Sequence, residues 1–251
     1  MKNLKLNSWL FGLGFLGVLS ALPLIPILLE AQSQPIPIPM STLQLISAVQ
    51  SAVLLIILVL VGSFFASKVG LKAPVLSAIV NGEDIIASLK PQLLPALIGG
   101  TAGGILLIAF FALMQGQLPA EFLAASETLA LPWYTRLLYG GITEEILVRW
   151  GIMSFFVWLL YRLTQTQEAP VRPYNFVFGI VVSAILFGVG HLPAASILSP
   201  EMTPSLVLYI IFANSIFGFI AGYLFWKRGL ESAILAHMMA HVVLMISSAF
   251  S

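Results

Sequence analysis

Long apolar stretches dominate the chain, and short polar segments interrupt them. A helix needs about 20 mainly apolar residues to cross a hydrocarbon core about 30 Å thick. The runs are continuous and lack the alternation that is typical of barrel strands. They predict an all-α polytopic bundle of about seven transmembrane helices, with six to eight possible; the fourth can also begin near Pro132, because proline suits a first helical position. The stretches are Trp9–Leu29, Leu43–Ala66, Leu93–Met114, Leu138–Tyr161, Asn175–Leu198, Ser205–Trp226 and Ser232–Phe250.

The composition excludes a water-soluble globule. Hydrophobic residues make up 59% of the chain and charged residues 8%, against about 45–50% and about 25% in soluble domains. A net charge of +1 supplies no basic face, which excludes a nucleic-acid partner. Cysteine is absent, so the chain offers neither a disulfide framework nor a thiolate zinc site. We therefore expect an integral multi-pass membrane protein that is surrounded by the lipid bilayer.

Lysine and arginine are distributed unevenly between the two ends of the expected helices. The positive-inside rule counts these residues in short loops. With the N-terminus inside, one cation lies in an outer segment, Arg136, and one lies within a span, Arg149. The inner cations are Lys2, Lys5, Lys68, Lys72, Lys90, Arg162, Arg172, Lys227 and Arg228. The imbalance predicts a cytoplasmic N-terminus, although one span more or fewer would reverse every segment after it.

Two of the expected connections are longer than turns. Ser67–Gln92 contains Pro91 and the apolar stretch Val75–Val80, which predicts a short interfacial helix on the inner side. Gln115–Trp133 is a mildly acidic outer connection. Within the spans, small residues four apart predict close packing of helices. These glycine pairs are Gly99/Gly103, Gly100/Gly104 and Gly218/Gly222.

Three short stretches carry all the charged groups and histidines that lie inside the spans: residues 140–149, 187–191 and 237–241. Placing an ionisable side chain near the centre of a transmembrane helix costs about 2.5–3.5 kcal/mol of insertion free energy. Such residues therefore usually indicate a functional site. Taken singly, each is also explained by a structural hydrogen bond between helices. Together, two carboxylates and three imidazoles from three helices favour a shared site.

Helix geometry separates the two carboxylates. Glu145 and Arg149 are four residues apart with the acid first, which favours an ion pair. Glu144 points about 100° away, has no cation on its own face, and is the candidate general base. His237 and His241 are also four apart, so both imidazoles project from one face of the last span.

A carboxylate and imidazoles inside a wet cavity can hydrolyse a peptide bond, which needs a base to activate water and a donor for the oxyanion. Glu144 with His191 can supply the first function, and His237 with His241 the second. Alternatively, these four residues can hold a zinc ion that does both. The soluble zincin motif is absent, because Met238 follows the first histidine where that motif has glutamate.

The three stretches resemble the motifs of the CPBP family of intramembrane proteases, which includes type II CAAX prenyl proteases and bacteriocin-processing proteins. The family pattern is EExxxR, then FxxxH, then HxxxN or HxxxD, on three separate transmembrane helices. The resemblance covers about Pro132–Val243. The corresponding residues here are Glu144-Glu145-xxx-Arg149, Phe187-xxx-His191 and His237-xxx-His241.

The resemblance implies roles for these residues. Glu144 and His191 would activate the attacking water, with Glu145 also in the catalytic set. His237 and residue 241 would stabilise the oxyanion or contribute to a metal site. Arg149 and Phe187 would bind substrate or hold the structure. On this interpretation, residues 1–92 form a two-span region with the interfacial segment, and residues 93–251 form a five-span catalytic part of one integrated membrane domain.

Position 241 departs from the family pattern, because it is histidine where asparagine or aspartate is expected. Histidine can still donate a hydrogen bond, and a third imidazole also favours zinc. Glu144 cannot easily be both a zinc ligand and the free base, and His237 and His241 are expected to lie deeper than Glu144. We therefore favour a site that requires no cofactor over one that requires zinc.

The expected function is an intramembrane endopeptidase that cleaves membrane-tethered peptides or proteins in a prokaryotic-type cell membrane. Two other classes use a similar set of residues: a proton-coupled transporter, and a non-catalytic binding or scaffold protein of the same fold. Buried Glu and His chains build proton relays. Transporters usually show an internal repeat, and none is visible here, which favours the protease. The membrane face to which the site opens stays undecided.

Overall fold

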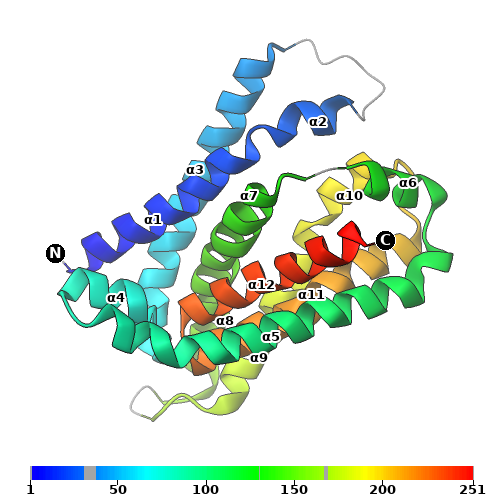
Figure 1. Cartoon of the computed structure of the whole chain (residues 1–251). Coiled ribbons are helices and arrows are strands. Elements are labelled where there is room, and N and C mark those ends of the chain that lie inside the picture. The colour runs from blue at the N-terminus through cyan, green and yellow to red at the C-terminus, as the bar shows by residue number, and fades with distance from the viewer. Residues whose placement is uncertain (1, 31–37, 130, 167–168, 251) are drawn as a thin grey trace.

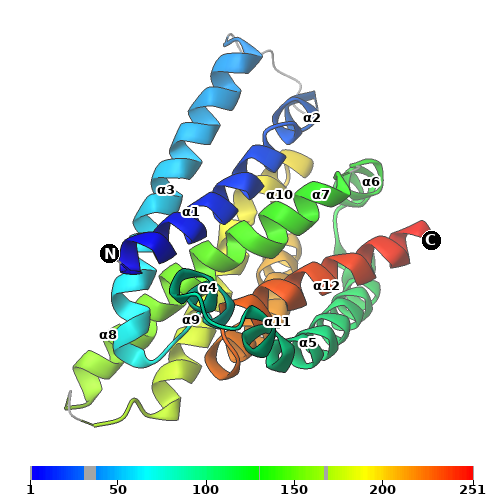
Figure 2. The same ribbon diagram turned by 60° about the vertical axis from the view of Figure 1, so that its left-hand side comes forward.

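The computed structural model describes residues 2–30, 38–129, 131–166 and 169–250. Every regular element within these ranges is a helix (Figure 1), and seven helices are long and apolar enough to cross a membrane. The expectation of an all-α polytopic bundle is confirmed. The N- and C-terminal ends of the described chain lie at opposite ends of the bundle in both views (Figures 1 and 2).

Six of the seven long helices are each built around one long labelled element. They are α1 (Lys2–Ala21), α3 (Met40–Val69), α5 (Ile85–Met114), α9 (Pro173–Gly190), α11 (Pro204–Lys227) and α12 (Leu230–Ala249). The seventh, here called the central helix, runs over Trp133–Thr164. Its parts are α7 (Trp133–Thr135), η2 (Arg136–Glu144), η3 (Ile146–Met153) and α8 (Ser154–Thr164). The short helices are α2 (Leu24–Glu30), α4 (Pro74–Asn81), η1 (Gln115–Gln117), α6 (Ala120–Thr128) and α10 (Leu192–Leu198).

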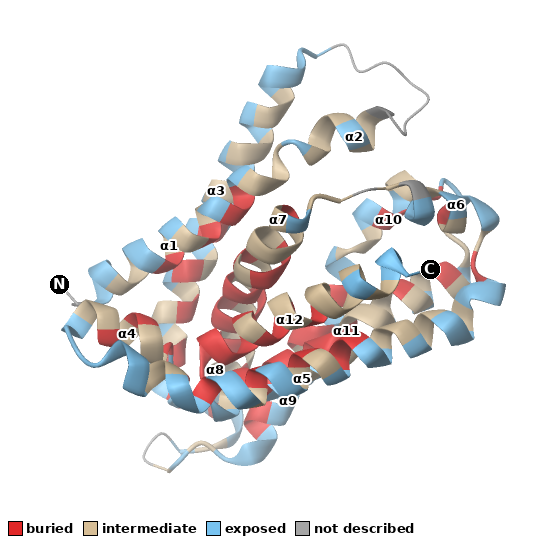
Figure 3. Ribbon diagram, viewed as in Figure 1, coloured by how far each residue is buried: buried red, intermediate tan, exposed pale blue. Residues whose placement is uncertain are grey.

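The central helix is the most enclosed of the seven. Of its most apolar stretch 50% is buried, against 17% for α3 and 17% for α5. Figure 3 shows buried residues gathered along it and on α11 and α12. Helices α1 and α12 pack on η2, while α3 and α9 pack on η3. The alternative start near Pro132 is confirmed, since the helix begins at Trp133 directly after that proline.

Most of the middle of the central helix is wound as a π-helix rather than as the α-helix that the sequence pattern predicted. In a π-helix the hydrogen bonds join residues five apart, and such segments are frequent at functional sites. The Ser154 side chain follows this spacing, since its Oγ donates to the Arg149 carbonyl at 3.4 Å. The Thr143 hydroxyl instead donates to the Gly14 carbonyl of α1 at 2.7 Å. The wider winding changes which residues share the inner face of this helix.

The first expected span, Trp9–Leu29, is two helices instead of one. Helix α1 ends at Ala21, and α2 begins at Leu24. Pro23 lies in the turn between them. Proline lacks a backbone N–H and disfavours helical geometry in the residue before it, which explains the break.

The third span begins earlier than expected. Helix α5 starts at Ile85 because the Asp84 carboxylate caps it, accepting hydrogen bonds from the backbone nitrogens of Ile86 (2.9 Å) and Ala87 (3.1 Å). Pro91 therefore lies inside a helix, and its assignment to a connection is wrong. The helix expected around Val75–Val80 is present as α4.

The glycine pairs on α5 lie between two neighbouring helices, as the spacing predicted. Gly99 and Gly103 face α11, and Gly100 and Gly104 face α12. A Cβ atom added at Gly104 would lie 2.7 Å from Val243 Cβ. Helices α5 and α12 accordingly lie side by side (Figures 1 and 2). These contacts fix the position of α12, which carries two of the three histidines.

Candidate active site

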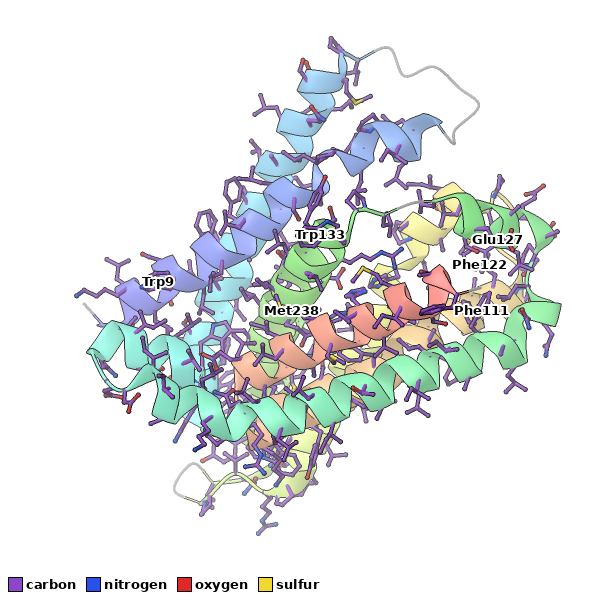
Figure 4. The ribbon with its side chains drawn as sticks, in the orientation of Figure 1. Trp9, Phe111, Phe122, Glu127, Trp133 and Met238 are labelled. Carbon is purple, nitrogen blue, oxygen red and sulfur yellow. The ribbon has the colours of Figure 1, made fainter. Side chains whose placement is uncertain are left out.

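A cavity of about 770 Å³ lies among α2, α5, α6, the central helix, α9, α11 and α12. It reaches the end of the bundle at which α5 ends, where Gln115 and the α6 residues Phe122 and Ser126 line it. Figure 4 shows Phe111 and Phe122 at this end. Most of the wall is apolar. The charged or strongly polar lining residues nearest the expected motifs are Arg136, Tyr139, Glu144, His191, Asn214, His237 and His241.

Glu144 and His191 lie close to each other on the wall of the cavity. His191 Nε2 lies 3.8 Å from Glu144 Oε1, and the two side chains are 33% and 17% exposed, respectively. His191 Nδ1 lies 2.8 Å from the Phe187 carbonyl oxygen, which can only accept, so Nδ1 donates. In the neutral imidazole Nε2 is then an acceptor. Two acceptors this close can bind the two hydrogens of one water molecule.

His191 is placed by a break that the sequence pattern did not predict. The fifth span was expected to be continuous over Asn175–Leu198, but α9 ends at Gly190 and α10 begins at Leu192. Pro193, in the first turn of α10, has no N–H to continue the helical ladder. The histidine therefore lies at the corner between two helices, with its side chain at the cavity.

Glu145 links two other site residues below the cavity surface. Its Oε2 lies 3.2 Å from Arg149 Nε, and its Oε1 accepts from His237 Nδ1 at 2.9 Å. The side chains of Glu145 and Arg149 are fully buried. The expected ion pair is confirmed, whereas the bond to His237 was not expected. Since Arg149 is engaged by Glu145, no cation lies within ion-pair distance of Glu144 among the described residues apart from the His191 imidazole.

The Arg149 guanidinium also contacts two other helices. Its Nη2 donates to the Gly218 carbonyl of α11 at 3.4 Å. Its carbon atom lies 5.1 Å from the centre of the Phe187 ring of α9, close enough for a cation–π interaction. Arg149 therefore joins the central helix to α9 and α11.

His237 and His241 stack on one face of α12, as their spacing predicted, with ring centres 4.9 Å apart and planes 10° apart. His237 commits Nδ1 to Glu145, which leaves Nε2. His241 is different: both of its ring nitrogens are buried and have no hydrogen-bond partner among the residues that the structure describes. Buried polar atoms usually have partners, so the His241 nitrogens are suited to a bound molecule.

Two glycines allow α12 to approach the central helix closely enough for this arrangement. A Cβ atom at Gly140 would lie 2.5 Å from His241 Nε2, and one at Gly141 would lie 2.5 Å from Met238 Cγ. Met238, labelled in Figure 4, belongs to α12. Any larger side chain at these two positions would displace the helix or its imidazole.

Aromatic rings surround the histidines. Phe187 packs edge-on against His191 at 4.7 Å and against His237 at 6.0 Å, and the Phe217 ring lies 4.4 Å from His237. Phe187 is 6% exposed. The ring of Phe187 thus contacts His191, His237 and Arg149, and its backbone carbonyl accepts a hydrogen bond from His191.

The four residues considered as zinc ligands do not include a converging set of three in the described structure. Among the described residues, no three His, Asp or Glu side chains converge closely enough to hold a metal ion. Zinc needs ligand distances of about 2.0–2.2 Å.

Three cavity residues were missed in the sequence. The sequence pattern places Arg136 in an outer segment, and Tyr139 and Asn214 carry neither a full charge nor an imidazole that would mark them within a span. One feature of the sequence does single out Arg136, because it is the one cation in an expected outer segment. Asn214 donates through Nδ2 to the Ile210 carbonyl at 2.8 Å.

Residues 105–243 match the model of a family described as type II CAAX prenyl endopeptidase, Rce1-like. The match covers more than half of the chain. It includes the site residues Arg136, Tyr139, Glu144, Glu145, Arg149, His191, Asn214, His237 and His241. No curated protein is significantly similar to the chain. No solved structure is significantly similar to it either.

Proposed function

Because the chain belongs to the Rce1-like type II CAAX prenyl endopeptidase family, we propose that it is an intramembrane endopeptidase that cleaves membrane-tethered peptides or proteins. The family is one of proteases, and the seven apolar helices make the chain a multi-pass membrane protein. The observation that carries the proposal is the facing pair of Glu144 and His191 in the cavity wall.

Glu144 is the general base of the proposed reaction. A water molecule donates one hydrogen to His191 Nε2 and the other to the Glu144 carboxylate, which directs its oxygen lone pair at the scissile carbonyl carbon. A C–O bond forms as the proton passes to Glu144. The tetrahedral intermediate then collapses, the C–N bond breaks, and Glu144 returns the proton to the leaving nitrogen. Atoms and charge balance without any further reactant.

His241 and His237 stabilise the oxyanion. A neutral imidazole carries one N–H, and His241 uses neither nitrogen within the described protein, so it can donate to the developing charge. His237 commits its Nδ1–H to the Glu145 carboxylate, so a second oxyanion donor from its Nε2 requires the imidazolium form. Glu145 and Arg149 act as positioning residues, since they hold His237 without reaching the cavity.

This mechanism uses no metal, and we derive no step through zinc. Glu144 and His191 activate the water, and imidazole N–H groups serve the oxyanion. The spacing of the candidate ligands supports this proposal, because no three of the described His, Asp and Glu side chains converge closely enough to hold a metal ion.

We further propose that the chain lies in a prokaryotic-type cell membrane with its N-terminus in the cytoplasm. The cavity reaches the end of α5 at Gln115, whereas the inner cations Lys68, Lys72 and Lys90 lie near the other end of that helix or just before it. On the positive-inside rule the cavity therefore opens toward the face opposite the cytoplasm.

Cleavage of a membrane-tethered peptide library by the purified protein in lipid nanodiscs tests the proposed function. Glu144→Gln should lower kcat by at least about 100-fold, which is the usual contribution of a general base, and His191→Ala should act similarly. Glu127→Gln is the matched control, because Glu127 is an exposed carboxylate on α6. Activity of Glu144→Gln within a few-fold of the wild type would overturn the mechanism. A library that the wild type leaves uncleaved would favour the non-catalytic scaffold.

A further inference from the structure

Asn214 is a polar residue of the cavity wall that the proposed mechanism does not use. It belongs to α11, and its half-buried side chain lines the cavity. The other α11 residues that line the cavity have mainly apolar side chains, and they are Tyr209, Ala213 and Phe217. A carboxamide in such surroundings costs free energy unless its nitrogen and its oxygen both find hydrogen-bond partners.

The backbone of α11 fixes the orientation of the Asn214 amide. Its Nδ2 lies 2.8 Å from the Ile210 carbonyl oxygen, which can only accept, so the NH₂ group is directed there. The Oδ1 atom has no hydrogen-bond partner among the described residues, and it is not enclosed by protein atoms. Asn214 therefore presents an acceptor, and no donor of its own, to the cavity.

Asn214 lies between His237 and the mouth of the cavity, which is the end lined by Phe122. Tyr209, near the start of α11, packs against Phe122, with ring centres 6.2 Å apart; Figure 4 labels Phe122. Further along α11, the Phe217 ring lies 4.4 Å from His237. Since an α-helix rises about 1.5 Å per residue, Asn214 lies about 4.5 Å from Phe217, on the mouth side. An extended peptide advances about 3.3 Å per residue, so its backbone passes Asn214 about one or two residues from the groups around His237.

The group that suits this acceptor is a backbone N–H of the substrate. A peptide carries an N–H at nearly every residue, and a mainly apolar cavity deprives that N–H of water. In the proposed mechanism, Glu144 and His191 accept hydrogen bonds from the attacking water, while His237 and His241 act as donors. The carboxamide oxygen of Asn214 is left to accept from the peptide itself.

We propose that Asn214 is a substrate-binding residue whose Oδ1 accepts a hydrogen bond from a substrate backbone N–H about one or two residues from the scissile bond, on the mouth side. The register rests on the proposed function, because it takes the groups around Glu144 as the point of cleavage. A bond to the backbone does not depend on the substrate side chains. It holds an apolar peptide in an extended conformation beside Glu144.

An ester scan of a short peptide tests this inference without relying on cleavage. An ester bond replaces one backbone N–H by an oxygen atom, which removes that donor without adding bulk. The probes are N-acetyl-Ala-Leu-Phe-Val-Ala-Leu amide and the analogues in which each internal amide in turn is an ester. Binding is measured by calorimetry with the Glu144→Gln protein in nanodiscs, and empty nanodiscs give the contribution of the lipid.

One of the esters should bind to the Glu144→Gln protein at least about fivefold more weakly than the parent peptide, as expected for the loss of a hydrogen bond. Adding Asn214→Leu should reduce the ratio for that ester to within about twofold, because the acceptor is gone. Asn214→Ala, which removes the acceptor without adding an apolar group, should give the same result. Asn214→Gln keeps the amide on a longer side chain and should retain part of the ratio.

Gln50→Leu is the matched control, since Gln50 is an exposed amide on α3 that does not line the cavity. It should keep the full ratio, and thermal unfolding should show that Asn214→Leu or Asn214→Ala is folded. Equal binding of all the esters, a ratio that persists in a folded variant without the acceptor, or a parent peptide that does not bind would overturn the inference. The expected ratios without any cleavage by the wild type would instead overturn only the proposed function.

Discussion

Glu145 Oε1 accepts a hydrogen bond from His237 Nδ1 at 2.9 Å, across the contact between the central helix and α12. The same carboxylate pairs with Arg149 through its other oxygen. One buried group therefore balances a guanidinium and orients an imidazole. The adjacent Glu144 is left to face His191, so two consecutive carboxylates have different tasks because they meet different helices.

Removing Arg149 should destabilise the fold more than it impairs any single chemical step. Arg149→Ala leaves the Glu145 carboxylate buried without its cation, and breaking a buried pair in this way costs about 3–5 kcal/mol. Thermal unfolding in detergent should show the loss, whereas Arg228→Ala should leave the midpoint within about 1 °C. A fully stable but inactive Arg149→Ala protein would place Arg149 in substrate binding instead.

Gly140→Ala should impair activity through His241. The added Cβ would lie 2.5 Å from His241 Nε2, so the imidazole must shift away from its place beside the cavity. We expect kcat to fall by about tenfold or more, since removal of an oxyanion donor costs about 100-fold or more. Gly116→Ala is the control, because a Cβ there meets nothing within 4 Å. Equal activity of both variants would argue against a role for the position of His241.

Chelation should leave activity intact. The proposed water activation and oxyanion binding use side chains alone, so purified protein should contain less than one zinc per chain and remain active after chelator treatment. Elemental analysis paired with the cleavage assay checks this expectation. Stoichiometric zinc whose removal abolishes activity, and whose return restores it, would refute the metal-independent mechanism.

Labelling of single cysteines should reveal the orientation. The chain has no cysteine, so each introduced thiol is unique. Glu83 precedes α5 and Gly116 follows it, and both positions are exposed. A membrane-impermeant maleimide should label Gly116→Cys in intact cells and Glu83→Cys only after the membrane is opened. The reverse pattern would mean that the cavity faces the cytoplasm.

The sequence predicted those parts of the site that depend on local spacing. Glu145 and Arg149 meet because residues four apart remain neighbours whether the helix is wound as α or as π. His237 and His241 stack for the same reason. The ends of the spans were less predictable where proline acts, since Pro23 and Pro193 break helices whereas Pro91 lies within one.

Contacts between distant segments could not be predicted in the same way. The bond from His237 to Glu145 joins residues 92 positions apart, and spacing gives no information about it. The sequence places Arg136 in a connection, because the continuous apolar run begins at Leu138. Arg136 was therefore not predicted to be a cavity residue. The π winding of residues 136–153 was also not predicted from the spacing of their polar and apolar side chains.

The pairing of Glu145 with Arg149 also bears on how the chain is made. The central helix leaves the ribosome well before α12, so Glu145 must enter the bilayer before His237 has been synthesised. A lone carboxylate or guanidinium would oppose that insertion. Because both charges lie on one helix, they can neutralise each other during translation, without waiting for another segment. The same two side chains that later position the imidazole thereby ease the passage of their own helix out of the translocon.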